Sequence, residues 1–285
     1  MGADLSAGRE FVLRNARLLD RQRFWWRFDG GSADAVVAAL LPYRNEDGGF
    51  GNALEPDLRG LASQPVPLEH ALAILDEVDR FDDGLVGPAC DWLESITRED
   101  GGIPFVLPSV TDGPHAPWWE PADASSLNPT AGIAGLLHKH GVDHPWVERA
   151  TAYCWEALSP GVDSLGGDDA ISVLGFLEHV PDRERADAAF ERVGARIRDE
   201  LVALDPATPG YVKGPLEFAR HPDRLARSLF DDATIELHLD ALEGKQEGDG
   251  GWPITWEPPS RAAVCEWRGF VTLMWLDVLA AYGRV

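Results

Sequence analysis

The sequence EDGGF at residues 46–50 recurs as EDGGI at residues 99–103 and as GDGGW at residues 248–252. The aspartates of the first two copies are 53 residues apart, and the third copy follows 149 residues later, close to three times 50. Weaker copies at 163–167 and 209–211 lie in this gap. A period near 50 is typical of two-helix units that bury their apolar faces by stacking. The spacing therefore predicts an all-helical repeat protein.

The helices that the pattern predicts are of two kinds. Residues 130–137 and 270–280 are small or apolar almost throughout, as helices buried on every side are. Residues 184–201 show only a narrow apolar stripe among charged residues, which is typical of a surface helix. An alternation of buried and amphipathic helices predicts an α/α toroid, in which an outer ring of helices surrounds an inner ring. We therefore predict one α/α toroid domain over residues 1–285, with five to six helix pairs.

Four long connections separate the predicted helices, at residues 45–66, 98–127, 203–227 and 246–261. Loops of this length in a compact domain are usually functional. Three of them contain an Asp-Gly-Gly turn or a degenerate copy of it, which predicts that all four lie at one end of the toroid. The two glycines permit positive φ and close backbone approach, and the aspartate can accept hydrogen bonds from the following amides. We interpret the turns themselves as structural hinges.

The turns at residues 47–50, 100–103 and 249–253 resemble those of the terpenoid cyclase and protein prenyltransferase superfamily, whose α/α barrels carry Gly-Gly-Trp or Gly-Gly-Phe turns. The repeat period extends this resemblance over nearly the whole chain. More narrowly, residues 43–59 (YRNEDGGFGNALEPDLR) resemble a group of bacterial prenyltransferase-like proteins without a settled activity. The resemblance implies the α/α toroid and a role connected with isoprenoids.

Two catalytic motifs of that superfamily are missing from this sequence. Class II terpenoid cyclases use an Asp-x-Asp-Asp motif, which does not occur here. Protein prenyltransferases bind zinc through an Asp-x-Cys pair, and no aspartate lies two positions before Cys90, Cys154 or Cys265. The resemblance therefore supplies no catalytic residues, and these must be sought elsewhere in the chain.

Composition excludes several classes of function. The chain has 48 acidic and 25 basic residues and a formal net charge of −23, which disfavours nucleic acid as a partner because binding it requires the neutralisation of phosphates. No uncharged apolar run reaches 18 residues, so we predict no transmembrane segment. The first residues lack the features of a secretory signal, which favours a cytoplasmic protein. The three isolated cysteines are interpreted as buried thiols.

The best catalytic candidates are Glu55, Asp57 and Arg59, which follow the first turn in one loop. A proton donor would require burial to raise the pKa of one carboxyl while the guanidinium keeps the other ionised. The alternative is an ion-paired loop that serves only stability.

Asp169 and Glu266 complete the predicted catalytic set. Asp169 opens a predicted helix, where a carboxylate caps the free amides or, together with a facing helix, binds Mg²⁺ for a diphosphate. Glu266 begins the apolar last helix, as either a salt-bridge residue or a site residue. We predict no metal site and no cofactor, except that Mg²⁺ would accompany a bound diphosphate.

Eleven tryptophans are many for 285 residues, and several lie in or beside the long loops. Aromatic walls shield a carbocation by cation–π attraction or stack on a sugar ring. Packing between helices is the alternative role. The predicted substrate-binding residues are Trp25, Trp26, Phe50, Trp118, Trp119, Trp252, Trp256, Trp267 and Arg268.

Three functions are compatible with these observations. We favour an isoprenoid-binding protein or an isoprenoid-converting enzyme with a hydrophobic cavity, whose partner is a small hydrophobic molecule or an isoprenoid diphosphate. The second is a carbohydrate-active (α/α)-barrel hydrolase or lyase, which would use paired carboxylates such as Glu55 and Asp57. The third is a non-catalytic helical-repeat scaffold.

Overall fold

The computed structural model describes residues 2–285, the side chain of Asp83 excepted. Within these residues the chain forms twelve α-helices and no β-strand, only isolated β-bridges, which confirms the all-α prediction. The helices belong to two compact units. The middle unit is Leu40–Ile197, and the terminal unit consists of residues 2–39 and Arg198–Val285.

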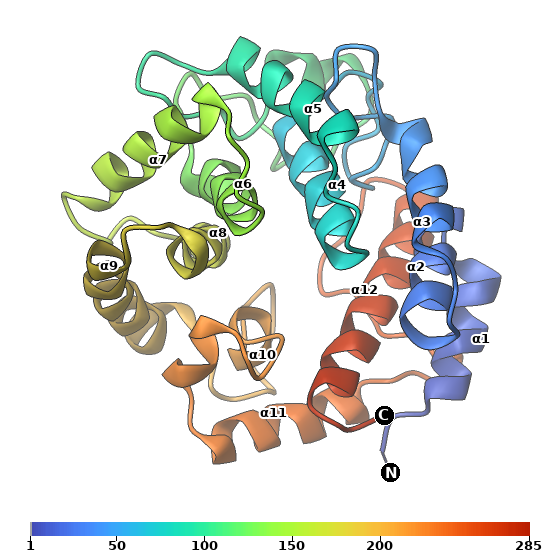
Figure 1. Cartoon of the computed structure of the whole chain (residues 1–285). Helices are drawn as coiled ribbons and strands as arrows, with labels where there is room; N and C mark the ends of the chain where they lie inside the picture. Colours follow the sequence, from blue (N-terminus) through green and yellow to red (C-terminus); the bar gives the residue numbers. More distant parts are fainter. Residues whose placement is uncertain (1) are drawn as a thin grey trace. The chain divides into compact units, whose positions relative to one another are not determined.

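The middle unit contains six α-helices (Figure 1). The helices rich in buried residues, α4, α6 and α8, lie in a row in which α6 packs against both of the others. The more amphipathic helices pack against this row: α5 contacts α4, α7 contacts α6, and α9 contacts α8. Their bounds are α4 Pro65–Glu77, α5 Asp83–Ile96, α6 Leu127–Lys139, α7 Pro145–Leu158, α8 Gly167–His179 and α9 Arg183–Arg196, with short 3-10 helices η1 Leu41–Tyr43 and η2 Pro108–Asp112.

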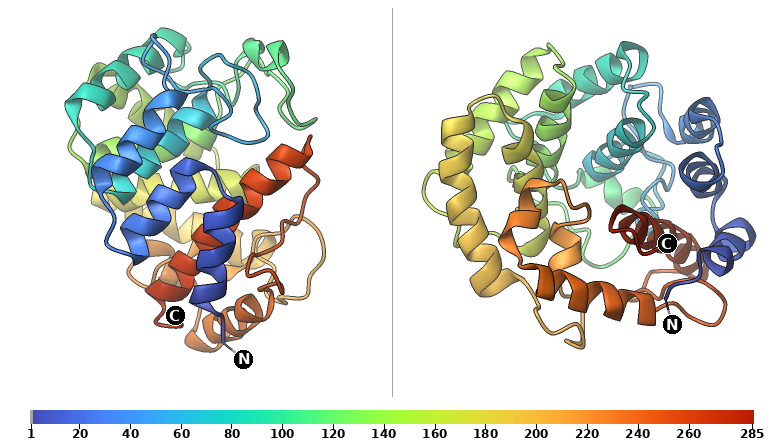
Figure 2. Two further views of the ribbon diagram at one scale, coloured as in Figure 1. Left: turned by 90° about the vertical axis from the view of Figure 1, so that its right-hand side faces the viewer. Right: turned by 60° about the horizontal axis from the view of Figure 1, so that its bottom comes forward.

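The terminal unit joins the two ends of the chain. The last helix, α12, packs against α1 and α2, and Figure 2 shows the first and last helices side by side. The short helix α10 packs against α11. The bounds are α1 Leu5–Asn15, α2 Leu18–Phe28, α3 Ala33–Leu40, α10 Pro215–Phe218, α11 Asp232–Gly244 and α12 Arg261–Ala281, with the π-helix η3 Ile197–Leu201 and the 3-10 helix η4 Leu225–Leu229.

The three Asp-Gly-Gly turns share one backbone geometry. Their first glycines, Gly48, Gly101 and Gly250, have φ of 91°, 88° and 91°. A Cβ at these positions would lie 2.3, 2.6 and 2.2 Å from a carbonyl oxygen of a neighbouring helix. Positive φ and this close approach both require glycine. The carbonyls belong to Pro88 in α5, Arg149 in α7 and Ala7 in α1.

The aspartate of each turn is held in the same way. Its Oδ1 accepts a hydrogen bond from the N–H of the second glycine at 2.9–3.0 Å. The same oxygen accepts from a side chain at 2.8, 2.7 and 2.9 Å in chain order. The donors are Ser63 to Asp47, Ser125 to Asp100 and Arg268 to Asp249. The aspartates therefore stabilise the turns, in agreement with their interpretation as hinges.

Two helix starts differ from the predicted ones. The N-cap of α8 is Gly166, and Asp169 lies at the third helical position, where its Oδ2 accepts from the N–H of Gly166 at 3.1 Å. Helix α12 begins at Arg261, where the Ser260 hydroxyl accepts from the N–H of Ala263 at 3.1 Å. Glu266 therefore lies inside α12 and not at its start.

The cysteine prediction is correct for two of the three residues. Cys90 and Cys154 are buried thiols, but Cys265, near the beginning of α12, is exposed. None of the helices in residues 2–285 combines the length and the hydropathy that crossing a lipid bilayer requires.

Candidate functional site

The loop with Glu55, Asp57 and Arg59 is packed into the middle unit. The Glu55 and Asp57 side chains are 2% exposed. Glu55 Oε2 accepts hydrogen bonds from the backbone N–H of Asp57 and, at 2.9 Å, from that of Leu58. The loop is also joined to residues 114–116, through Arg59 N–H to the Pro114 oxygen and Ala116 N–H to the Asp57 oxygen. The structure thus places the three residues in one packed loop, which the Glu55 carboxylate closes.

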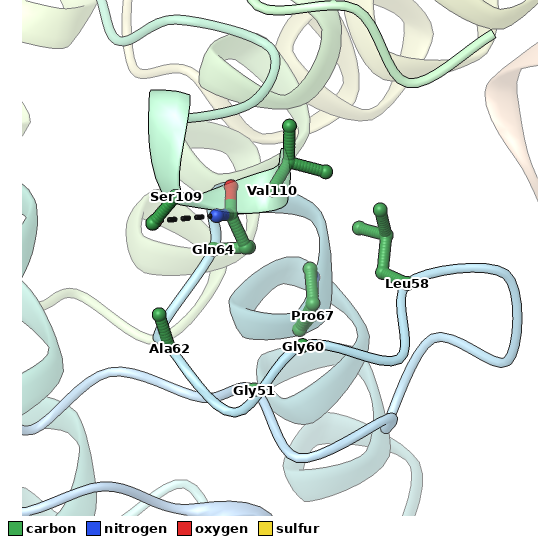
Figure 3. A pocket seen from close by; sticks show the side chains of 8 residues that line it. All are labelled: Gly51, Leu58, Gly60, Ala62, Gln64, Pro67, Ser109 and Val110. Carbon is green, nitrogen blue, oxygen red and sulfur yellow. Dashed lines mark hydrogen bonds between the residues drawn. The ribbon is translucent and has the colours of Figure 1, made fainter. Parts of the chain in front are cut away.

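A small cavity lies beside this loop, where it meets the start of α4 and the 3-10 helix η2 (Figure 3). Its volume is about 10 Å³, and Gln64 Nε2 donates to Ser109 Oγ at 2.9 Å on its wall. A cavity of this size has room for about one water molecule. It holds neither an isoprenoid chain nor a sugar ring.

The other predicted charged residues are divided between the two units. Asp169 is half-buried at the start of α8 in the middle unit, and Glu266 is half-buried in α12 of the terminal unit. Arg268 binds the third turn: its Nη1 is 2.8 Å from Asp249 Oδ2 and its Nη2 is 2.6 Å from Glu247 Oε2. The hydrogen bond from Arg268 lowers the pKa of Asp249. Arg268 is therefore part of the hinge.

Several of the predicted aromatic residues are core side chains. Phe50 and Trp252 are 1% exposed, and Trp252 Nε1 donates to the Leu242 oxygen at 2.9 Å. Trp119 is 7% exposed and stacks on Phe105, with ring centroids 4.9 Å apart. Trp118 is exposed, and Trp25 and Trp26 are half-buried on α2.

Trp256 and Trp267 come together in the terminal unit as part of a longer aromatic row. Their rings meet edge to face at 5.0 Å. Tyr211 extends the row from Trp256 at 5.9 Å, and Phe270 extends it from Trp267 at 5.5 Å, with interplanar angles of 89° and 90°. Tyr211 is 59% exposed, so one end of the row is open to solvent. We call Tyr211, Trp256, Trp267 and Phe270 the aromatic row.

Two cations and one unsatisfied indole complete the surroundings of the aromatic row. Lys213 Nζ lies 4.3 Å from the Tyr211 ring, and the Arg23 guanidinium lies 5.4 Å from the Phe270 ring. The buried Trp267 Nε1 has no hydrogen-bond partner within residues 2–285. Sequence reasoning named the two tryptophans but missed Tyr211 and Phe270, because the row is built from two loops and a helix.

Sequence reasoning also missed an acidic group in the middle unit. Glu69 on α4 is half-buried, and its Oε1 would lie 2.0 Å from a Cβ at Gly132 of α6, so the carboxyl rests directly on the α6 backbone. The position of that Cβ is 3.6 Å from Ser172 Oγ of α8, and Ser172 Oγ lies 3.4 Å from Asn128 Oδ1. Three helices thus contribute polar groups around this carboxyl.

The environment of Glu69 changes its acidity. Burial, and to a lesser extent the nearby carboxylate of Asp168, together raise the pKa of Glu69 to about 8. The carboxyl makes no hydrogen bond or ion pair within the described part of the chain. A carboxylic acid that stays protonated at neutral pH can serve as a general acid. The available sequence signal was that Glu69 is the only acidic residue between Pro65 and Leu75.

Comparisons with known proteins show the fold of the chain. No family model and no curated protein matches it. The chain is similar to a protein from Actinoplanes of known crystal structure, with a TM-score of 0.61 over 98% of this chain and 99% of that one. The two sequences are 18% identical, so the likeness concerns the fold alone.

Proposed function

We propose that this protein binds or converts an isoprenoid and that the aromatic row contacts the hydrocarbon chain. The observation that supports this proposal is the row itself: four rings in edge-to-face succession, with one end exposed. Such rings bury apolar chains, and their faces attract cations. Lys213 at the exposed end supplies a positive charge of the kind that a diphosphate group requires.

The α/α toroid and a relationship to terpenoid cyclases and prenyltransferases are part of this proposal. They are supported by the common geometry of the three turns, which recur near a 50-residue period. The predicted cytoplasmic location belongs to the proposal as well. No group of three His, Cys, Asp or Glu side chains in residues 2–285 is arranged to hold a metal ion, and we assign no residues to Mg²⁺.

The proposal is tested by calorimetry and thermal unfolding with farnesyl diphosphate, geranylgeranyl diphosphate and a panel of oligosaccharides. A ligand at one hundred times its Kd stabilises the folded state by about 2.7 kcal/mol. We expect stabilisation by an isoprenoid and at least tenfold weaker binding for Trp256→Ala. Trp118→Ala removes an exposed indole outside the row and is the matched control, with unchanged binding expected. Stabilisation by glycans but by no isoprenoid would contradict the proposal.

A carbohydrate-active enzyme is the second candidate, and Glu69 favours it. A neutral carboxylic acid near a second carboxylate, with amide and hydroxyl groups beside it, is an arrangement that glycosidases use. Cleavage of a glycan by the wild type, lost in Glu69→Gln, would establish this candidate. Isoprenoid binding that persists in Glu69→Gln while product formation stops would instead assign the acid to isoprenoid chemistry.

A further inference from the structure

A second cavity, of about 150 Å³, lies in the middle unit between the end of α7 and one face of α9. It has an apolar part and a strongly basic rim. The lining residues are Trp155, Leu158, Ser159, Arg185, Ala188 and Arg192. None of them belongs to the aromatic row or to the surroundings of Glu69.

The two arginines lie on one face of α9. Arg185 and Arg192 are seven residues apart, which corresponds to about 10 Å along a helix. Ala188 lies between them, and its short side chain leaves the space that forms the cavity. Two arginine side chains therefore line the same hollow.

Neither of these arginines makes an ion pair within residues 2–285, although the chain has 48 acidic and only 25 basic residues. On the same helix, Arg183 pairs with Asp187 at 3.5 Å. Helical side chains pair at spacings of three or four residues, and at these spacings from Arg185 the only acid is Asp182. Its carboxylate is occupied as the N-cap and accepts from the Arg185 N–H at 3.2 Å. The positive charges of the pocket are thus available to a ligand.

Contacts with α7 hold both side chains in place. The Arg185 guanidinium lies 4.4 Å from the Trp155 ring centroid, and Trp155 in turn packs edge to face on Phe176 at 5.0 Å. Arg192 Nη2 donates to the Leu158 oxygen at 3.4 Å. Each guanidinium has five N–H donors, so these contacts leave most of them for an oxyanion.

We propose that this pocket binds a phosphoryl group of a small phosphorylated molecule, with Arg185 and Arg192 on either side and the Ser159 hydroxyl as a further donor. Guanidinium groups match the tetrahedral oxygens of phosphate, and the pocket is too small for a macromolecular partner. The proposal does not depend on the isoprenoid function, because the two sites share no residue.

The test is isothermal titration of the full chain with inorganic phosphate and with pyrophosphate at low ionic strength. Arg185→Gln and Arg192→Gln are each expected to weaken binding at least tenfold. Arg198→Gln removes the same charge from an exposed position outside the pocket, and its Kd should stay within twofold of the wild type. Circular dichroism and thermal unfolding show whether each variant is folded.

Three results would overturn the proposal. The first is no binding of either anion by the folded wild type. The second is an equal loss in Arg198→Gln, which would mean that the charge acts diffusely and not in the pocket. The third is equally tight binding of acetate, which would mean that the pocket does not distinguish a phosphoryl group from other anions.

Discussion

Glu55 and Glu69 belong to the same unit, and Glu55 is buried whereas Glu69 is half-buried, yet it is their hydrogen-bonding surroundings that are opposite. Glu55 accepts hydrogen bonds from two backbone N–H groups of its own loop. Glu69 makes no hydrogen bond in the described residues and lies against α6 near the Asp168 carboxylate. The first arrangement satisfies a charged carboxylate, and the second favours a neutral acid. The comparison separates a glutamate that maintains structure from one that is available for chemistry.

The largest effect is expected at Glu55. Glu55→Ala removes the carboxylate that binds both N–H groups and leaves the buried N–H of Asp57 without its acceptor, whereas the N–H of Leu58 keeps the main-chain oxygen of residue 55 at 3.0 Å. The free energy of unfolding should fall by about 3 kcal/mol. Urea unfolding measures this change. Glu55→Gln keeps a carbonyl acceptor and should cost less than half as much. Equal stabilities of the two variants would show that the hydrogen bonds do not hold the loop.

A smaller, pH-dependent effect is expected at Glu69. Because its pKa is about 8 in the folded state and ordinary in the unfolded chain, the folded state binds more protons between about pH 4.5 and 8. Wild-type stability therefore falls as pH rises through this window. Glu69→Gln lacks this dependence. The full shift corresponds to about 3.5 kcal/mol between pH 5 and pH 8, and solvent screening of the half-buried carboxyl reduces the expected gain on the wild type to about 1 to 2 kcal/mol.

Urea unfolding at the two pH values checks this expectation. Glu156→Gln, at an exposed position of α7, is the matched control and should differ from the wild type by the same amount at both pH values. A Glu69→Gln variant whose advantage does not grow with pH would show that Glu69 is not protonated in the folded protein.

Gly132→Ala should act on Glu69 without a large change in stability. The new Cβ would overlap the Glu69 carboxyl, which must move away from α6 toward water, and its pKa should fall toward the ordinary value. Carbon-13 NMR titration of the glutamate carboxyls measures this fall. At Gly175 of α8 a Cβ meets no atom within 4 Å, so Gly175→Ala should leave the Glu69 pKa unchanged and stabilise by up to about 1 kcal/mol. A raised pKa that survives Gly132→Ala would contradict this packing.

The smallest effect is expected at Asp168. Asp168→Asn removes the second cause of the raised pKa of Glu69 but leaves the first, which is burial. The pKa of Glu69 should therefore fall slightly and stay above its ordinary value. Because Asp168 is exposed, added salt should reduce the difference between variant and wild type. A fall to the ordinary value would make Asp168, and not burial, the dominant cause.

The Asp-Gly-Gly turns show how much the sequence could predict. The positive φ of Gly48 and the hydrogen bond from the Gly49 N–H to Asp47 arise within the turn itself and have few alternatives. The close approach of Gly48 to the Pro88 carbonyl of α5 is a tertiary contact. The helical class followed from their spacing. The start of α12 was predicted too late, because its first residues, Arg261–Ala263, lack an apolar pattern and the Ser260 cap was overlooked.

The aromatic row and the acid could not be predicted in the same way. The row adds Tyr211 and Phe270 to two tryptophans that are distant from Tyr211 in the chain. Glu69 and Asp168 come from different helices, α4 and α8, and nothing near Glu69 in the sequence indicates its neighbour. Glu55 was the more obvious candidate because Asp57 and Arg59 are close to it in the sequence. The same closeness lets the Glu55 carboxylate accept hydrogen bonds from the N–H groups of its own loop.

The sequence by itself determined that this protein is helical and where its Asp-Gly-Gly turns lie, because hydrogen bonds and φ angles within a few residues decide both. Only the tertiary structure decided which glutamate is a neutral acid and which aromatic rings meet. The desolvation of a carboxyl and the contacts between aromatic rings depend on segments that are far apart in the chain, so no local sequence pattern predicts them.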